Sequence, residues 1–137
     1  MAEDKLINDA PRIQQWMHQR SRLPIQQEFR GVAREVDGKI VAAFGYDSFQ
    51  DTLCQLHLCV DSPTAISRKL LRTAFWVPFV QWNYSSLLAI IRTDNAKSLN
   101  MAARLGFEEF AVLPGSLHFS VMHRDKCRWI YPAGGST

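Results

Sequence analysis

Residues 94–107 constrain the fold of this chain more than any other stretch. They follow an apolar run, residues 87–91, that is typical of a buried strand. Asp94 or Asn95 is a suitable N-cap, and the next ten residues are mostly good helix formers with apolar positions on one face. Gly106 stands where a helix-ending residue takes a positive φ, and Phe107 begins the next expected strand. The stretch therefore predicts a strand, a capped helix, a glycine stop and a strand.

The rest of the chain predicts a sheet that is mostly antiparallel. Asp37-Gly38 is a strong hairpin signal, and a second turn at 50–52 leads to a third strand. A helix that Pro78 ends or kinks separates the third and fourth strands, so these two should be parallel. The expected strands are 29–36, 39–46, 53–60, 86–92, 107–113 and 117–124, and the expected helices are 9–23, 66–77 and 95–104; residues 1–8 are a frayed end or a short edge strand.

Length and composition limit the class of protein. With 137 residues, 47% hydrophobic and 21% charged, we expect a single domain over residues 1–131 and a disordered tail at 132–137. The net charge of +3 suits an anionic ligand but is too small to indicate nucleic-acid binding. The N-terminus does not resemble a signal peptide, and no apolar run has the roughly 18 residues of a membrane helix. Three cysteines, an odd number, favour a reducing compartment such as the cytoplasm, and the spacing of cysteines and histidines predicts no metal site.

The 94–107 stretch resembles the motif of the GNAT superfamily, the acetyl-coenzyme A-dependent N-acetyltransferases. The matching positions are Asn95, Ser98 and the closing Leu-Gly-Phe at 105–107, and the order of elements over residues 9–130 is also that of the family. The resemblance implies an α/β (α+β) fold with a mixed, mostly antiparallel central sheet, helices on both faces and a splayed parallel strand pair. The ending at 122–129 also resembles small GNAT-like proteins of tailed phages, which would place the chain in a host cytoplasm.

The resemblance further implies where acetyl-coenzyme A, as a cosubstrate, would bind. Backbone groups near Leu58, Cys59 and Val60 would hydrogen-bond the acetyl carbonyl and the pantetheine amides, where a fixed N–H stabilises an oxyanion. Asn95 would hydrogen-bond the pantetheine arm, with Ser98 beside it.

The same resemblance puts the pyrophosphate at the start of the crossover helix, where Ser67, Arg68 and Lys69 are the candidate ligands. The family has a glycine-rich loop there, but this chain has no glycine between Gly45 and Gly106. The basic residues also fit a simple solvated helix face.

Two residues are candidates for proton transfer. His57 on the third strand has a side chain suited to a general base at neutral pH, or it is a structural histidine. Tyr46 at the end of the neighbouring strand is a candidate acid or substrate wall, or an ordinary strand aromatic. The tyrosine that the family often has on the motif helix is replaced here by Ala102.

Two functions follow. The first is an enzyme, a GNAT-type acyltransferase that moves an acetyl group to a primary amine of a small molecule or protein by direct attack. The second is a catalytically degenerate GNAT-fold protein that acts by binding or assembly, as a viral accessory protein would. Either function is compatible with a homodimer, and neither involves a membrane.

Overall fold

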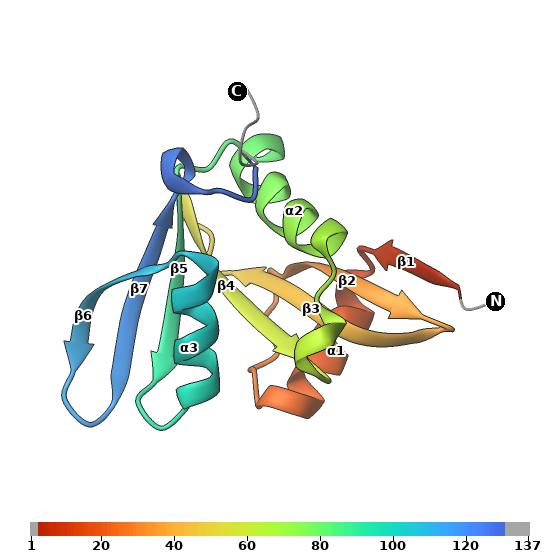
Figure 1. Ribbon diagram of the computed structural model, residues 1–137, viewed down its shortest axis with the longest axis horizontal. Helices are drawn as coiled ribbons and strands as arrows, with labels where there is room; N and C mark the ends of the chain where they lie inside the picture. The colour runs from red at the N-terminus through yellow and green to blue at the C-terminus, as the bar shows by residue number, and fades with distance from the viewer. Residues whose placement is uncertain (1–2, 131–137) are drawn as a thin grey trace.

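The computed structural model describes residues 3–130, so the predicted disorder at 132–137 lies outside the described residues. One seven-stranded sheet runs through it in the order β1-β2-β3-β4-β5-β7-β6 (Figure 1). The predicted fold class is confirmed: β4 and β5 are parallel, and the neighbouring pairs β1–β2, β2–β3, β3–β4, β5–β7 and β6–β7 are antiparallel. The strands are β1 (Asp4–Ile7), β2 (Arg30–Val36), β3 (Lys39–Asp47), β4 (Leu53–Val60), β5 (Ser86–Arg92), β6 (Glu108–Leu113) and β7 (Leu117–His123).

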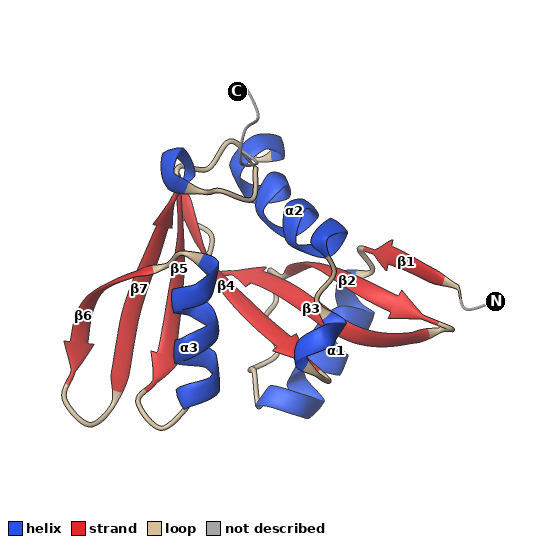
Figure 2. Ribbon diagram, in the orientation of Figure 1, coloured by secondary structure: helices blue, strands red, loops and turns tan. Residues whose placement is uncertain are grey.

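Helices cover both faces of the sheet, as predicted (Figure 2). Helices α2 (Arg68–Trp76) and α3 (Ala96–Leu105) share one face and its larger core, which includes Phe44 and Phe75. Helix α1 (Ala10–Ser21) lies on the opposite face and buries Ile13 and Met17 in a smaller core. No helix within residues 3–130 is long and apolar enough to cross a membrane.

The local signals read from the sequence explain the ends of these elements. Asp9 caps α1 by accepting a hydrogen bond from the Arg12 backbone N–H. Asp37 and Gly38 both have positive φ, as a two-residue hairpin turn requires. Gly106 ends α3 with a φ of 110°.

Pro78 changes the helix after α2 rather than simply stopping it. The chain continues as a wider turn, η2 (Val77–Gln81), with π-helical hydrogen bonding. Pro78 has no N–H for the carbonyl of Ala74, and the hydroxyl of Tyr46 donates to that oxygen at 2.5 Å. The tyrosine thus completes the hydrogen bonding of a proline-interrupted helix.

Candidate functional site

The parallel strands β4 and β5 stay together only at their first residues. Within residues 3–130 their pairing is limited to Leu53↔Ser86, Cys54↔Leu87 and Gln55↔Leu88. Strand β5 stays paired with β7 over its whole length. Strands β4 and β5 therefore diverge from one another towards their C-terminal ends (Figure 1). The last four residues of β4 are only partly buried, although β4 is the central strand of the sheet. The predicted splay is therefore present; we call the region between the parted ends the β4–β5 slot.

The direction of the backbone groups along β4 follows from its pairing with β3. The N–H of Asp61 donates to the Val41 carbonyl of β3, and the register continues without a bulge to the start of β4. Because backbone groups of successive residues point to opposite edges of a strand, those of Leu58 and Val60 turn towards the slot. Those of Cys59 turn towards β3, so its backbone is committed to the sheet. This corrects the expectation that Cys59 supplies a backbone contact to a cofactor.

Helix α3 begins next to the C-terminal end of β5, where β4 and β5 lie apart (Figure 1). Asn95 is its N-cap, and the side-chain oxygen accepts from the Ser98 backbone N–H at 3.2 Å. The amide nitrogen of this exposed side chain remains as a donor that capping does not use. Ser98 is half-buried in the first turn of the helix. Asn95 thus has a capping role that is compatible with a ligand contact.

The start of α2 lies at the other rim, after residues 61–67, which follow β4. Ser67 is the N-cap and accepts from the Leu70 backbone N–H at 3.1 Å, so its hydroxyl hydrogen is still free to donate elsewhere. Arg68 and Lys69 are exposed in the first turn. These are the groups an anion needs at a helix N-terminus.

The segment before α2 takes the place of a glycine-rich loop. It forms a short turn, η1 (Pro63–Ala65), and Arg34 of β2 donates to the Ala65 carbonyl at 2.9 Å. The same arginine pairs with Asp4, while Asp61 pairs with Arg20 of α1. The loop is thus fixed by arginines from distant elements, which sequence reasoning missed because the partners are remote in the chain.

His57 lies two residues beyond the last β4–β5 pair and has a partner that sequence analysis did not single out. Its Nε2 is 3.0 Å from both carboxylate oxygens of Asp47, the last residue of β3. The Asp47 side chain is 4% exposed and that of His57 is 19% exposed. The strand register places both side chains on the face that α1 covers. An imidazole held by a buried carboxylate is an arrangement suited to moving a proton.

Tyr46 does not fit the predicted catalytic role. The residue is 1% exposed, packs in the larger core against Trp82 and donates its hydroxyl to Ala74. Burial raises the pKa of its phenol well above the ordinary value, which is unfavourable for proton donation near neutral pH. The predicted acid is thus a core residue, because its parity on β3 points it away from His57.

The thiols are equally poor reactive groups. Burial raises the pKa of Cys54 to about 12 and also raises the pKa of Cys59. Among residues 3–130, no group of three or more histidine, cysteine or acidic side chains is arranged to hold a metal ion.

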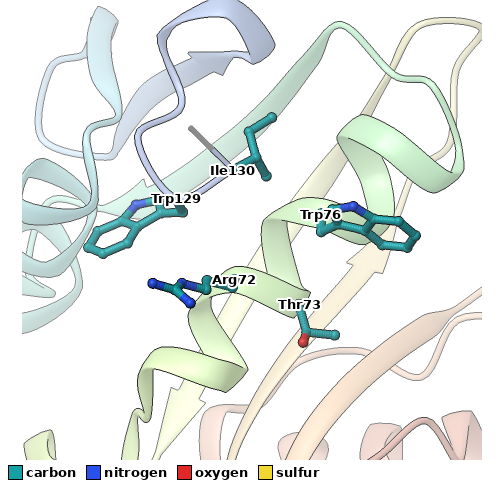
Figure 3. A pocket seen from close by; sticks show the side chains of 5 residues that line it. All are labelled: Arg72, Thr73, Trp76, Trp129 and Ile130. Atoms are coloured by element: carbon teal, nitrogen blue, oxygen red, sulfur yellow. The ribbon is translucent and has the colours of Figure 1, made fainter. Parts of the chain in front are cut away.

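A shallow pocket lies outside the slot, between α2 and the segment after β7 (Figure 3). It has a volume of about 260 Å³, and Arg72 and Trp129 approach one another across it. Trp129 is held there by its indole N–H, which donates to the Leu105 carbonyl at 2.8 Å. The pocket contains none of the predicted site residues; its lining is Arg72, Thr73, Trp76, Trp129 and Ile130.

Comparison with solved structures identifies the fold. The chain superposes on the spermidine/spermine N-acetyltransferase SpeG of Vibrio cholerae with a TM-score of 0.71 at 10% identity, over 96% of this chain and 99% of that chain. It matches the N-acetyltransferase PseH of Campylobacter jejuni with a TM-score of 0.63 at 12% identity, over 88% and 98%. A dodecameric structure of the Vibrio cholerae spermidine N-acetyltransferase matches with a TM-score of 0.67 at 11% identity, over 97% and 98%.

No protein-family model matches the sequence, and no curated protein matches it. The likeness is therefore one of structure at very low sequence identity. It shows that the chain has the GNAT fold of N-acetyltransferases, as the motif at 94–107 predicted. The resemblance to phage proteins stays a prediction.

Proposed function

We propose that this protein is an N-acetyltransferase that moves the acetyl group of acetyl-coenzyme A to a primary amine by direct attack. The observation that carries the proposal is the parting of β4 from β5 after Gln55 and Leu88, in a chain with the GNAT fold. The slot has backbone groups on one rim, a capped helix at each side of its mouth and a histidine near its closed end.

Binding would use the groups that the strands and caps leave available. The backbone N–H groups of Leu58 and Val60 are directed at the slot and suit the acetyl carbonyl and a pantetheine amide. The amide nitrogen of Asn95 suits a pantetheine carbonyl. The start of α2, with Ser67, Arg68 and Lys69, suits the pyrophosphate.

The cosubstrate would supply an acyl thioester, and the protein would position the amine against it. Attack forms a C–N bond and pushes charge onto the carbonyl oxygen, where a fixed backbone N–H of β4 stabilises it. His57 takes the proton that the amine loses. The C–S bond then breaks and the thiolate leaves to be protonated by solvent, so an acid such as the family tyrosine is not required. Polyamines are the first acceptors to test, because two of the similar structures are spermidine acetyltransferases.

The binding step is tested with coenzyme A and two variants of α3. A ligand at about 100 times its dissociation constant stabilises a protein by about 2.7 kcal/mol, so coenzyme A should raise the melting temperature measurably. Asn95→Asp keeps the helix cap but removes the amide donor, and we expect the shift to fall by at least half. Asn100→Asp, exposed on the same helix, adds the same charge and should keep the full shift. An absence of any shift at millimolar coenzyme A contradicts the proposal.

A second candidate is a GNAT-fold protein that binds partners without catalysis. It is favoured by the glycine-free segment 61–67, which arginines hold in place, and by the buried position of Tyr46. This candidate predicts no acetyl transfer to any amine even when coenzyme A binds. Transfer measured by thiol release with a polyamine acceptor separates the two functions.

We also propose that the protein works in the cytoplasm as a homodimer. Support for the dimer comes from the edge strand β6, all six residues of which are exposed. Phe110 is 60% exposed and Leu113 is 51% exposed. An apolar edge strand offers both backbone hydrogen bonds and apolar surface to a second copy.

A further inference from the structure

A carboxylate that the sequence motif does not include lies against the proposed base. Asp47 is the last residue of β3, and Gln55 is its partner on β4. His57 stands opposite Gly45, so the aspartate and the histidine are diagonal neighbours on one face of the sheet. Both Asp47 oxygens are 3.0 Å from Nε2 of the imidazole.

The Asp47 carboxylate is buried against the imidazole of His57. In the part of the chain from residue 3 to residue 130, the His57 imidazole is the side-chain group within hydrogen-bond distance of the Asp47 oxygens, and an ionised carboxylate can only accept. A buried charged group without a donor is costly, so this hydrogen bond strongly favours a proton on Nε2. On the same face of the sheet, the ring of Phe29 lies against Gly45, the residue opposite His57.

The tautomer has a chemical consequence. A neutral imidazole with its proton on Nε2 has its lone pair on Nδ1. We infer that Asp47 is a positioning residue that fixes His57 in the Nε2–H tautomer, so that Nδ1 is the atom that takes the proton from the acceptor amine. The inference rests on the proposed acetyl transfer. In that step the amine nitrogen bonds the carbonyl carbon, the thioester C–S bond breaks with its electron pair on sulfur, and the amine proton moves to Nδ1.

The location of the pair supports this role over a purely structural one. His57 is the second residue after Gln55, where β4 and β5 begin to part. Its side chain is 19% exposed, whereas Asp47 behind it is 4% exposed. The carboxylate therefore forms the buried side of the pair and the imidazole forms the accessible side, as in sites where an acidic group orients a catalytic histidine.

The tautomer is measured first, by ¹⁵N NMR of histidine-labelled protein, with His57→Gln assigning the resonance among the four histidines. We expect the Nε2–H tautomer for His57 in the wild type at neutral to mildly alkaline pH. Asp47→Ser should produce a mixture of tautomers, while Asp51→Asn, an exposed aspartate in the next loop, should leave the resonance unchanged. An unchanged tautomer in folded Asp47→Ser, or in folded Asp47→Ala if the serine variant does not fold, overturns the inference.

Kinetics decide whether the positioning matters for transfer. Removing the carboxylate should lower kcat about tenfold to a hundredfold, part of the roughly 10²- to 10⁴-fold that a general base contributes, with KM for acetyl-coenzyme A unchanged. A full kcat in a variant with a mixed tautomer also overturns the inference. Failure of the wild type to bind coenzyme A is a different result: it removes the proposed function, whereas the NMR measurement still decides whether Asp47 orients His57.

Discussion

At the scale of single residues, Glu35 is the clearest case of a charge held by its surroundings. The residue is 6% exposed on β2, and its carboxylate accepts from the Arg12 guanidinium of α1 and pairs with Lys5 of β1. The hydrogen bond from Arg12 is the main cause that lowers the pKa of Glu35 below its ordinary value, and the charge of Lys5 adds to it. One buried carboxylate thus connects α1, β1 and β2.

This lowered pKa predicts a pH dependence of stability. A carboxyl whose pKa is lower in the folded state contributes stability above its unfolded pKa, and that contribution is lost as the pH falls through the folded pKa. Glu35→Gln should therefore lower the free energy of unfolding at pH 6, and the difference from wild type should shrink steadily below about pH 4. Urea unfolding at several pH values measures this difference, and Asp51→Asn is the exposed control. A difference that is the same at pH 3 and pH 6 contradicts the prediction.

At the scale of elements, β3 depends on a glycine to pack closely against residues on the α1 face of the sheet. A Cβ at Gly45 would lie 2.6 Å from Cζ of Phe29 and 3.1 Å from the Met17 sulfur. Gly45→Ala should therefore destabilise the protein by about 1–3 kcal/mol through overpacking. Shortening the ring partner in Gly45→Ala/Phe29→Leu should recover part of that loss, because the clash is with the ring. Denaturant unfolding of the two single variants and the double variant gives the coupling free energy between the two positions. If the losses in unfolding free energy of the single variants simply add in the double variant, the clash with the ring is not the cause of the destabilisation.

The elements themselves could be predicted because their signals are local. Residues 53–60 alternate and are bounded by turn residues, and the structure has a strand there with the same bounds. Asn95 and Gly106 flank α3 as its two caps. Each of these features is decided by a few neighbouring residues, whose side chains cap the helix or set its periodicity.

The site was only partly predictable from the sequence because it depends on how β3 and β4 are aligned and on which face of the sheet each side chain lies. Asp47 meets His57 because Gly45 of β3 pairs with His57 of β4. The length of the loop between β3 and β4 does not by itself fix this register. Tyr46, one residue away, points to the opposite face and into the core. Arg34 reaches the carbonyl of Ala65 from a strand far away in the sequence. Long-range pairings of this kind leave no pattern in a single sequence.

At the scale of the whole molecule, the sheet has two edges of unequal character. The edge formed by β1 is short and charged, with Asp4 paired to Arg34. The edge formed by β6 is longer and carries Phe110, Val112 and Leu113 with 45–60% of each residue exposed. Short charged edges resist pairing with another chain, whereas long apolar edges promote it. The asymmetry favours association through β6 and a closed dimer rather than an open chain of copies.

The dimer is predicted to depend on this strand. Sedimentation over about 1–200 µM protein should show a monomer–dimer equilibrium, and Phe110→Lys/Val112→Lys should weaken it by tenfold or more, because apolar anchors dominate such interfaces and lysine on an edge opposes pairing. The control is Val80→Lys, which places one lysine on a valine of η2 that is as exposed as Val112 and should leave the equilibrium unchanged. If the wild type is monomeric throughout, or if the β6 double variant dimerises as the wild type does, β6 is not the interface. The register shift between Glu109 and Ala111 then gives the physical reason, since a bulge twists an edge away from a flat partner.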